Sequence, residues 1–351
     1  MWYNIRIENG SRPGKDDRAL FDFSSSPLLA RRTSGERRFR LWVELLLAYL
    51  IAIFIPLFSG FVPGVAATLI LGFNGMMGVF NDALSSGMAG GAGTIDREAY
   101  NALSKAIAES EGYRVAELFG SAWVIAAAIF VCLVLHRRSL ATMGIEKKGA
   151  AKRYGLGLLF GVVLCSAGIL ISVLSRASTF GGLSQNVSYS LLFFFLLGYV
   201  VQGAAEEILI HGLLMTSLAR GMRWLPAVLL SALTFSFLHV SNGGVTLLSL
   251  LNVFLFGVFL GLFVLRTGSV IGAAALHTAW NFVEGHIFGC SVSGFSAATG
   301  LFTVTADASR AATNGGEFGP EGGLAVTMIL MLALIAVLFL PSFGKKRRET
   351  T

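Results

Sequence analysis

Residues 189–218 read YSLLFFFLLGYVVQGAAEEILIHGLLMTSL, an almost unbroken apolar stretch that contains two adjacent carboxylates and a histidine. A helix needs about 20 apolar residues to cross a bilayer, so this stretch predicts a membrane span. Glu206 lies fourteen residues before Arg220, which is about 21 Å along a helix that rises 1.5 Å per residue. A charge at that depth costs about 2.5–3.5 kcal/mol, so two adjacent carboxylates need a neutralising cation or a bound proton. The pair therefore marks a candidate functional site.

The rest of the chain has the same apolar character. Of its 351 residues, 54% are hydrophobic and 13% are charged, against about 25% charged in soluble domains. The mean hydropathy is +0.71. This composition excludes a soluble globular enzyme, a disordered chain and a disulfide-stapled secreted module. The three cysteines form no disulfide framework and no metal-ligand spacing. The net charge of +7 is carried mostly between apolar segments, which indicates membrane topology and no nucleic acid partner.

The apolar runs predict an all-α polytopic bundle of about eight spans. They lie at about 41–59, 118–135, 154–175, 189–218, 224–241, 245–265, 269–289 and 323–342. Loop 81–117 carries six acids and three bases, whereas loop 136–153 carries six bases and one acid. If the Gly- and Pro-containing run 61–80 does not cross, every basic cluster and both termini are cytoplasmic, as the positive-inside rule requires. We therefore expect that run to be partly embedded.

This topology divides the chain into five parts. They are a cytoplasmic N-terminal tail (1–40), a membrane region (41–136) with the outer loop 81–117, a motif-bearing core (137–289), a second outer loop (290–322), and a last span with a basic cytoplasmic tail (323–351). Residues 96–117 read as a short amphipathic helix. Each outer loop is either a solvated connector or a lid over a site. Gly257 and Gly261 form a small-xxx-small pair, which permits close helix packing.

Three of the predicted spans carry polar groups. In 189–218, Glu207 and His211 are i,i+4 and share a helix face, while Glu206 points about 100° away. In 224–241, His239 stands alone on an apolar helix, where a structural role is common. In 269–289, His277 and Asn281 are i,i+4, so both could donate to one small anionic atom, as an oxyanion site requires. Hydrogen bonding between helices is the alternative.

Further along the same span, Glu284 and His286 fall near its end. We expect both side chains to lie at the membrane interface.

Together the three motifs resemble the CPBP family of intramembrane proteases, which includes CAAX-processing endopeptidases and bacterial Abi-type proteins. That family has EExxxR, FxxxH and HxxxN or HxxxB on separate helices. This chain has Glu206-Glu207 with His211, then Phe235 with His239, then His277 with Asn281. The resemblance covers about residues 137–289. One position departs from the pattern, because His211 stands where the family has an arginine, a fork of donors that is always charged.

The resemblance implies a role for each residue. Glu206 is the general base that activates a water, and His239 helps to hold that water. His277 and Asn281 stabilise the tetrahedral oxyanion. Glu207 and His211 support the site. Peptide hydrolysis would then proceed without a covalent intermediate.

Whether a metal takes part stays open at this stage. Glu206, His239 and His277 could furnish three ligands, with water as the fourth, as in a catalytic zinc site. The chain contains no HExxH motif, and a metal-free glutamate mechanism is the alternative.

The function expected from the sequence is therefore that of an intramembrane endopeptidase. It would act on a peptide or protein substrate at the lipid bilayer, as a multi-pass protein of the bacterial cytoplasmic membrane, in an unknown oligomeric state. One alternative is a non-catalytic membrane scaffold or immunity-type protein, motivated by the His211 departure. The other is a transporter with Glu206 and Glu207 as ion carriers, although the chain shows no repeated half.

Overall fold

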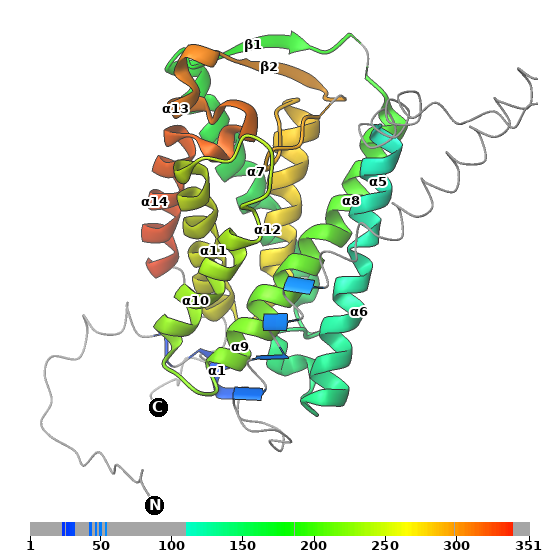
Figure 1. Ribbon diagram of the computed structural model, residues 1–351, viewed down its shortest axis with the longest axis vertical. Coiled ribbons are helices and arrows are strands. Elements are labelled where there is room, and N and C mark those ends of the chain that lie inside the picture. Colours follow the sequence, from blue (N-terminus) through cyan, green and yellow to red (C-terminus); the bar gives the residue numbers. More distant parts are fainter. Residues whose placement is uncertain are drawn as a thin grey trace, which may run out of the picture.

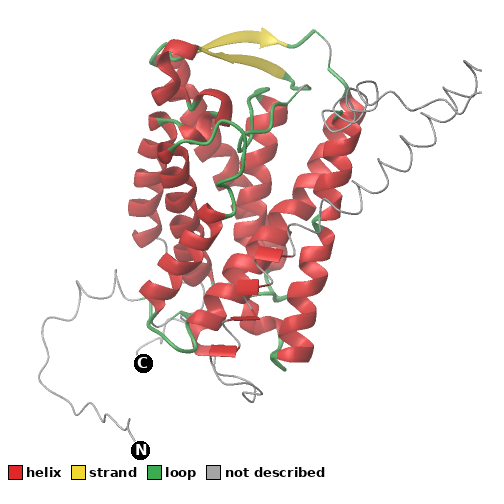
Figure 2. Ribbon diagram, in the orientation of Figure 1, coloured by secondary structure: helices red, strands yellow, loops and turns green. Residues whose placement is uncertain are grey.

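The computed structural model describes residues 23–24, 26–31, 42–43, 46–47, 49–50, 53–54 and 110–339, apart from residues 186 and 298. Among these residues the chain is mostly helical (Figure 2). The run 61–80 lies outside the described residues, as do most of the expected span 41–59 and the outer loop up to residue 109.

Eleven helices run through the described residues in this order: α1 (Pro27–Arg31), α5 (Glu111–Gly120), α6 (Ala122–Phe130), α7 (Ala150–Leu174), α8 (Tyr189–Glu207), α9 (Met215–Leu218), α10 (Trp224–Phe237), α11 (Leu247–Thr267), α12 (Val270–Phe282), α13 (Ala311–Asn314) and α14 (Leu324–Phe339). Turns of π-helix, Val131–Leu135, Ile208–Leu214 and Val283–Ile287, continue α6, α8 and α12. Single 3-10 turns occupy Leu140–Met143, Ala308–Arg310, Gly316–Phe318 and Pro320–Gly322.

Four helical segments of the described chain are long and apolar enough to cross a membrane. They are Glu111–Leu135, Ala150–Leu174, Tyr189–Leu218 and Leu247–Thr267, and two shorter apolar helices are Trp224–Phe237 and Leu324–Phe339. The expected helical membrane architecture is thus confirmed in part. The count of eight spans and the orientation of the termini stay predictions.

The first long helix starts earlier than expected. Ser110 accepts a hydrogen bond from the Tyr113 amide at 3.3 Å and caps α5, and α5 and α6 continue almost without a break. Residues 111–117, expected as the end of a short amphipathic helix in the outer loop, instead continue directly into the span. Their acids and Arg114 lower the local hydropathy, which is why the span was expected to begin only at residue 118.

Helix α12 is the centre of the bundle, and glycines bring its neighbours close. A Cβ added at Gly157 or Gly161 of α7 would lie 2.0 Å from the Gly272 carbonyl oxygen or 2.3 Å from that of Leu276. The two backbones therefore touch. The expected pair Gly257 and Gly261 also serves packing, because added Cβ atoms would lie 3.1 Å from Ala232 and from Val228 of α10. Figure 1 shows α12 between α14 and α11 on one side and α8 and α6 on the other.

The expectation of an all-helical chain misses one small sheet. Strands β1 (Ser178–Leu183) and β2 (Phe302–Ala306) pair antiparallel, with Ser178 opposite Ala306 and Phe180 opposite Val304. The sheet closes one end of the bundle (Figure 1). Strand β1 (STFGGL) contains two glycines and gives no period-2 signal. Strand β2 (FTVTA) does alternate apolar and polar residues, but its partner lies more than 110 residues earlier in the chain.

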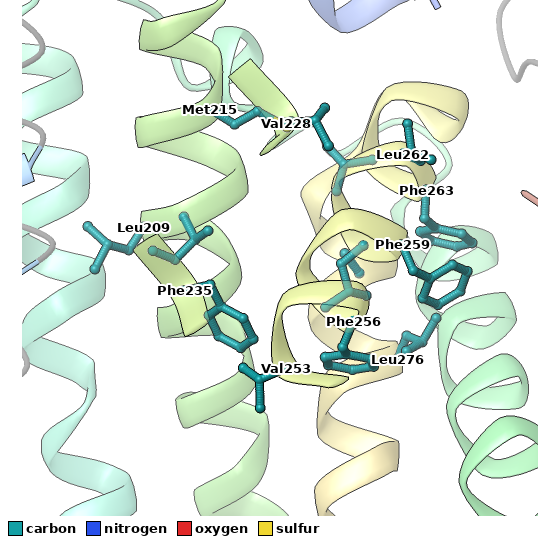
Figure 3. Packing of buried hydrophobic residues seen from close by; sticks show 14 of the residues in the cluster. Leu209, Met215, Val228, Phe235, Val253, Phe256, Phe259, Leu262, Phe263 and Leu276 are labelled. Carbon is teal, nitrogen blue, oxygen red and sulfur yellow. The ribbon is translucent and has the colours of Figure 1, made fainter. Parts of the chain in front are cut away.

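The buried core lies between α8, α10, α11 and α12. Figure 3 shows the Phe235 ring beside Val253, with Phe256, Leu276 and Phe259 beyond them. These side chains are almost entirely enclosed, so the polar groups among them must find partners inside the protein.

At the other end of the bundle, part of the N-terminal tail docks onto the helices. The Ser26 hydroxyl donates to the Leu265 carbonyl oxygen at 2.6 Å, and Arg31 lies 2.8 Å from Glu146. The Arg266 guanidinium stacks over the Phe23 ring at 4.4 Å.

Candidate active site

Helix α8 places both carboxylates and then changes its geometry. Ser188 caps its start by accepting from the Leu191 amide at 3.5 Å. The α-helix ends at Glu207 and continues as a π-helical turn over Ile208–Leu214. Turns of π-helix are rare in proteins, and those that occur are often found at functional sites. Here the turn follows directly on the two glutamates and contains His211.

Glu207 is the buried anchor of the site. Its side chain is fully enclosed, with Oε2 at 2.6 Å from Nδ1 of His211 and Oε1 at 3.0 Å from Nδ1 of His277. The other ring nitrogen of His211 lies 2.9 Å from the Gly257 carbonyl oxygen. A carbonyl only accepts, so this nitrogen carries a hydrogen. His211 therefore ties α8 to α11, and Glu207 ties α8 to α12.

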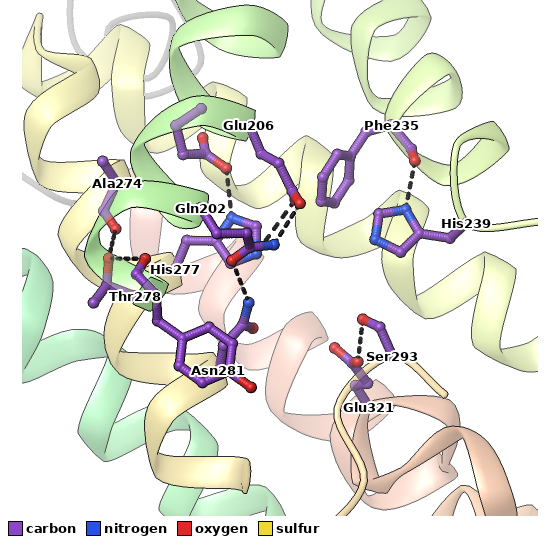
Figure 4. Close-up of polar contacts among 12 residues, drawn as sticks. Gln202, Glu206, Phe235, His239, Ala274, His277, Thr278, Asn281, Ser293 and Glu321 are labelled. Carbon is purple, nitrogen blue, oxygen red and sulfur yellow. Dashed lines mark hydrogen bonds and ion pairs between the residues drawn. The ribbon is translucent and has the colours of Figure 1, made fainter. Parts of the chain in front are cut away.

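The Glu206 side chain points away from that of Glu207 and lines a cavity. Its side chain keeps 31% of its surface exposed, and its Oε2 lies 3.7 Å from Nε2 of His277. Its Oε1 accepts a hydrogen bond from the Gln202 amide, and that amide accepts one from Asn281 Nδ2 at 3.0 Å. Figure 4 shows Glu206, Gln202, His277 and Asn281 meeting between the two helices.

His239 comes from the turn that follows α10. Its Nδ1 lies 2.8 Å from the Phe235 carbonyl oxygen and must donate to it. The Phe235 ring stands edge-on to both His239 and His277, with ring centroids 4.8 and 5.9 Å away. One aromatic ring thus separates the two imidazoles and fixes their planes (Figure 4).

One cavity of about 250 Å³ joins these groups. Glu206, His239, His277 and Asn281 all line it. Part of its wall comes from segments expected to be loops, namely the first turn of α5 with Arg114 and residues 292–297. Arg114 stacks over the Phe295 ring at 5.4 Å across this boundary. The four side chains proposed for chemistry therefore share one space.

The sequence did not point to several polar groups near the site. Gln202 sits at i−4 from Glu206, and this spacing inside an apolar span could have revealed it. Glu321 lines a second, very small cavity together with His239 and His277 and accepts from the Ser293 hydroxyl. Burial raises the pKa of Glu321. Glu321 lies far from the three motifs in the sequence, so no local spacing could have predicted its place near the site.

Glu284 and His286 are buried inside the protein, and their expected position at the membrane interface stays a prediction. Their exposed fractions are 0% and 1%. Glu284 accepts from the Glu321 amide at 3.1 Å, and Nδ1 of His286 lies 2.7 Å from the Thr299 carbonyl oxygen. The segment 290–322 folds back over this end of α12 and encloses them.

A zinc site is not formed by the side chains as they stand. Among the described residues, no group of three or more His, Cys, Asp or Glu side chains could hold a metal ion. Nε2 of His277 lies 3.7 Å from Glu206, and the Phe235 ring is edge-on to both His277 and His239. In this arrangement Glu206, His239 and His277 do not form the ligand set proposed for zinc.

The chain resembles one known protein family in the region of the site. Residues 188–283 match the family model described as type II CAAX prenyl endopeptidase Rce1-like. This segment is similar to the Rce1-like family. It contains Glu206, Glu207, His211, His239, His277 and Asn281, so the family recognised from the motifs is confirmed. No curated protein and no solved structure matches the chain.

The Rce1-like domain belongs to a family of proteases, which are hydrolases. Its helices α8 to α12 sit in a chain with several helices apolar enough to cross a membrane. The domain therefore indicates an integral membrane protease whose substrate is associated with the membrane.

Proposed function

We propose that this protein is an intramembrane endopeptidase that hydrolyses a peptide bond of a membrane-associated substrate by means of a glutamate-activated water. One observation carries the proposal. Glu206, His239, His277 and Asn281 come from three separate elements and line a single cavity, and beside it Glu206 Oε2 lies 3.7 Å from His277 Nε2 with no hydrogen-bond partner among the described residues.

In this mechanism Glu206 Oε2 accepts a proton from a water as the water attacks the scissile carbonyl carbon. His239 has its Nδ1 committed to Phe235, which leaves Nε2 to hold that water. The attack converts the carbonyl oxygen into an oxyanion. The oxyanion then re-forms the carbonyl and the scissile C–N bond breaks. The proton held by Glu206 passes to the leaving amine, which restores the Glu206 carboxylate.

The oxyanion is stabilised from α12. Asn281 gives one of its two amide hydrogens to Gln202 and keeps the other for the oxyanion. His277 donates through Nε2 when its ring carries both protons, with Nδ1 held by Glu207. Donors fixed in position before the reaction are the largest single contribution in many hydrolases.

His211 supports this arrangement in place of the family arginine. It contacts both Glu207 and the Gly257 carbonyl oxygen, so the carboxylate keeps a hydrogen-bonding partner. His211 in place of the family arginine is therefore not an argument that the protein is a non-catalytic scaffold.

The test compares the wild type with Glu206→Gln after reconstitution into lipid nanodiscs. The probes are internally quenched peptides that carry an apolar anchor, including a prenylated peptide ending in Cys-a-a-X and its unprenylated form. We expect the variant to lose at least about 10²-fold in kcat, the scale of a removed general base. Glu317→Gln is the matched control, because Glu317 is an exposed acid on the loop that covers the bundle end.

Two results would refute the proposal. One is a wild type that cleaves none of the peptides faster than Glu206→Gln does. The other is full activity of Glu206→Gln itself. The transporter alternative predicts that Asn281→Ala is tolerated, because transport needs no oxyanion stabiliser, whereas the protease should lose activity.

A further inference from the structure

Gln202 lies one helical turn before Glu206 on α8 and connects two groups of the proposed mechanism. Its Nε2 donates to Glu206 Oε1, and its Oε1 accepts from Asn281 Nδ2 at 3.0 Å. Figure 4 shows this amide between the carboxylate and the asparagine. Residues of α8 and α12 that are 79 positions apart are thereby joined through one side chain.

Chemistry fixes the orientation of this amide. An ionised carboxylate has no hydrogen to give, so the NH₂ end of Gln202 must face Glu206. Only the carbonyl end is then left for Asn281, which must answer with its own NH₂ group. The direction of every hydrogen bond in the chain from Asn281 to Glu206 therefore follows from the charge on Glu206.

This polarity assigns different tasks to the two oxygens of Glu206. Oε1 is engaged by Gln202, whereas Oε2 is buried without a hydrogen-bond partner among the described residues and lies 3.7 Å from His277 Nε2. Oε2 is thus the oxygen of Glu206 that has no hydrogen bond committed among the described residues. On Asn281, one amide hydrogen is engaged and the second is left for the oxyanion.

The helices at this point are held at a fixed separation. A Cβ added at Gly203, the next residue of α8, would lie 2.9 Å from Thr278 Oγ1 of α12. The Thr278 hydroxyl in turn lies 3.1 Å from the Tyr199 carbonyl oxygen of α8. The amide of Gln202 therefore spans a gap that the backbone itself maintains, and its length matches that gap.

We infer that Gln202 is a positioning residue of the reaction, which aligns the base Glu206 and the oxyanion donor Asn281 with each other. The inference rests on the proposed function. Gln202 acts through these two side chains, so its removal should slow the chemical step and leave substrate binding nearly unchanged.

The experiment uses the full chain in nanodiscs with whichever quenched peptide the wild type cleaves. Gln202→Met keeps the length of the side chain and removes both hydrogen bonds, and Gln202→Glu keeps the shape but places a second carboxylate against Glu206. We expect kcat to fall about 10- to 100-fold for Gln202→Met, because small displacements of reacting groups cost that much, with KM within about twofold. Gln202→Glu should lose at least as much.

A double-mutant cycle on kcat distinguishes a positioning role of Gln202 from a purely structural one. After Asn281→Ala has removed the oxyanion donor, Gln202→Met should cost much less than it does in the wild type, because the two residues act as one unit. Ser190→Ala, an exposed position at the start of the same helix, is the control for changes to α8. Thermal unfolding of each variant shows whether it is folded.

The outcomes separate the two claims. If the wild type is active, Glu206→Gln is inactive, and Gln202→Met retains the wild-type kcat or is additive with Asn281→Ala, the inference about Gln202 is overturned and the protease proposal stands. If the wild type is no more active than Glu206→Gln, both are overturned. If Gln202→Met does not fold, Gln202→Glu decides, and a folded Gln202→Glu with normal kcat overturns the inference.

Discussion

Glu207 and His277 are joined by a contact of 3.0 Å between Oε1 and Nδ1, inside the bundle and away from solvent. The contact fixes which nitrogen of His277 faces the cavity, because Nδ1 is committed to the carboxylate. The second oxygen of Glu207 is committed to His211. A supporting carboxylate thus determines the orientation of a ring proposed to act on the substrate.

The first prediction concerns His211. Its replacement by alanine leaves Oε2 of Glu207 buried with its imidazole partner gone, and removing one partner of a buried pair costs about 3–5 kcal/mol. We expect His211→Ala to lower the free energy of unfolding by an amount of that order, measured by denaturant titration in detergent. Met215→Leu, an equally buried position in the following helix, should change it by less than about 1.5 kcal/mol. Equal stability of the two variants would contradict this role.

The second prediction concerns the contact between α7 and α12. Gly161→Ala places a methyl group 2.3 Å from the Leu276 carbonyl oxygen, so α12 must move and carry His277 with it. Overpacking of this kind costs about 1–3 kcal/mol, and we expect a loss of activity larger than the loss of stability would explain. Gly155→Ala on the same helix is the control, because a Cβ there meets nothing within 4 Å. Unchanged activity in Gly161→Ala would show that α12 is not held by this contact.

The third prediction is a pH dependence that arises at His136, just beyond the end of the first long span. Burial lowers the pKa of His136 to about 4, and the positive charges of Arg138 and Arg220 act in the same direction. Neither ring nitrogen has a hydrogen-bond partner among the described residues. In the unfolded chain the imidazole has its ordinary pKa of 6.5, whereas in the folded protein the pKa is about 4. The unfolded chain therefore binds the proton first, and stability is lost as the pH falls from about 6.5 toward 4.

His136→Leu removes this group, so the variant should gain thermal stability over the wild type as the pH falls from 7.5 to 5. The measurement is the difference in Tm between the two proteins across that range. A difference that stays constant with pH would show that His136 does not contribute to acid sensitivity.

The fourth prediction concerns metal. Because no group of ligands among the described residues could hold a metal ion, we expect activity to survive exhaustive dialysis against a chelator. Elemental analysis of the wild type and His239→Ala checks this directly. About one zinc per chain in the wild type, lost in His239→Ala, would overturn the metal-free mechanism.

Much of the architecture could be read from the chain. Long apolar runs predicted helices at 154–175, 189–218 and 245–265, and the structure has α7, α8 with α9, and α11 there. The same runs also marked the functional site. A carboxylate inside an apolar run costs too much free energy to occur without a purpose. The i,i+4 spacing of Glu207 with His211 also predicted their contact, because local helical geometry alone decides it.

Contacts between distant segments could not be read in this way. The sheet of β1 with β2, the folding of 290–322 over Glu284, and the bridge from Gln202 to Asn281 each join residues far apart in sequence. Local patterns report the periodicity of one helix or strand, and they carry no information on which faces meet.

The sequence by itself determined a helical membrane protein and the six polar residues of the three motifs, because hydropathy and helical spacing are local properties. Only the tertiary structure decided that four of these residues line one cavity, that Glu207 holds both His211 and His277, and that Gln202 connects the base to Asn281. The physical reason is close packing: glycines on α7 and α8 let α12 approach to backbone contact, and only at that separation can side chains from different helices form hydrogen bonds.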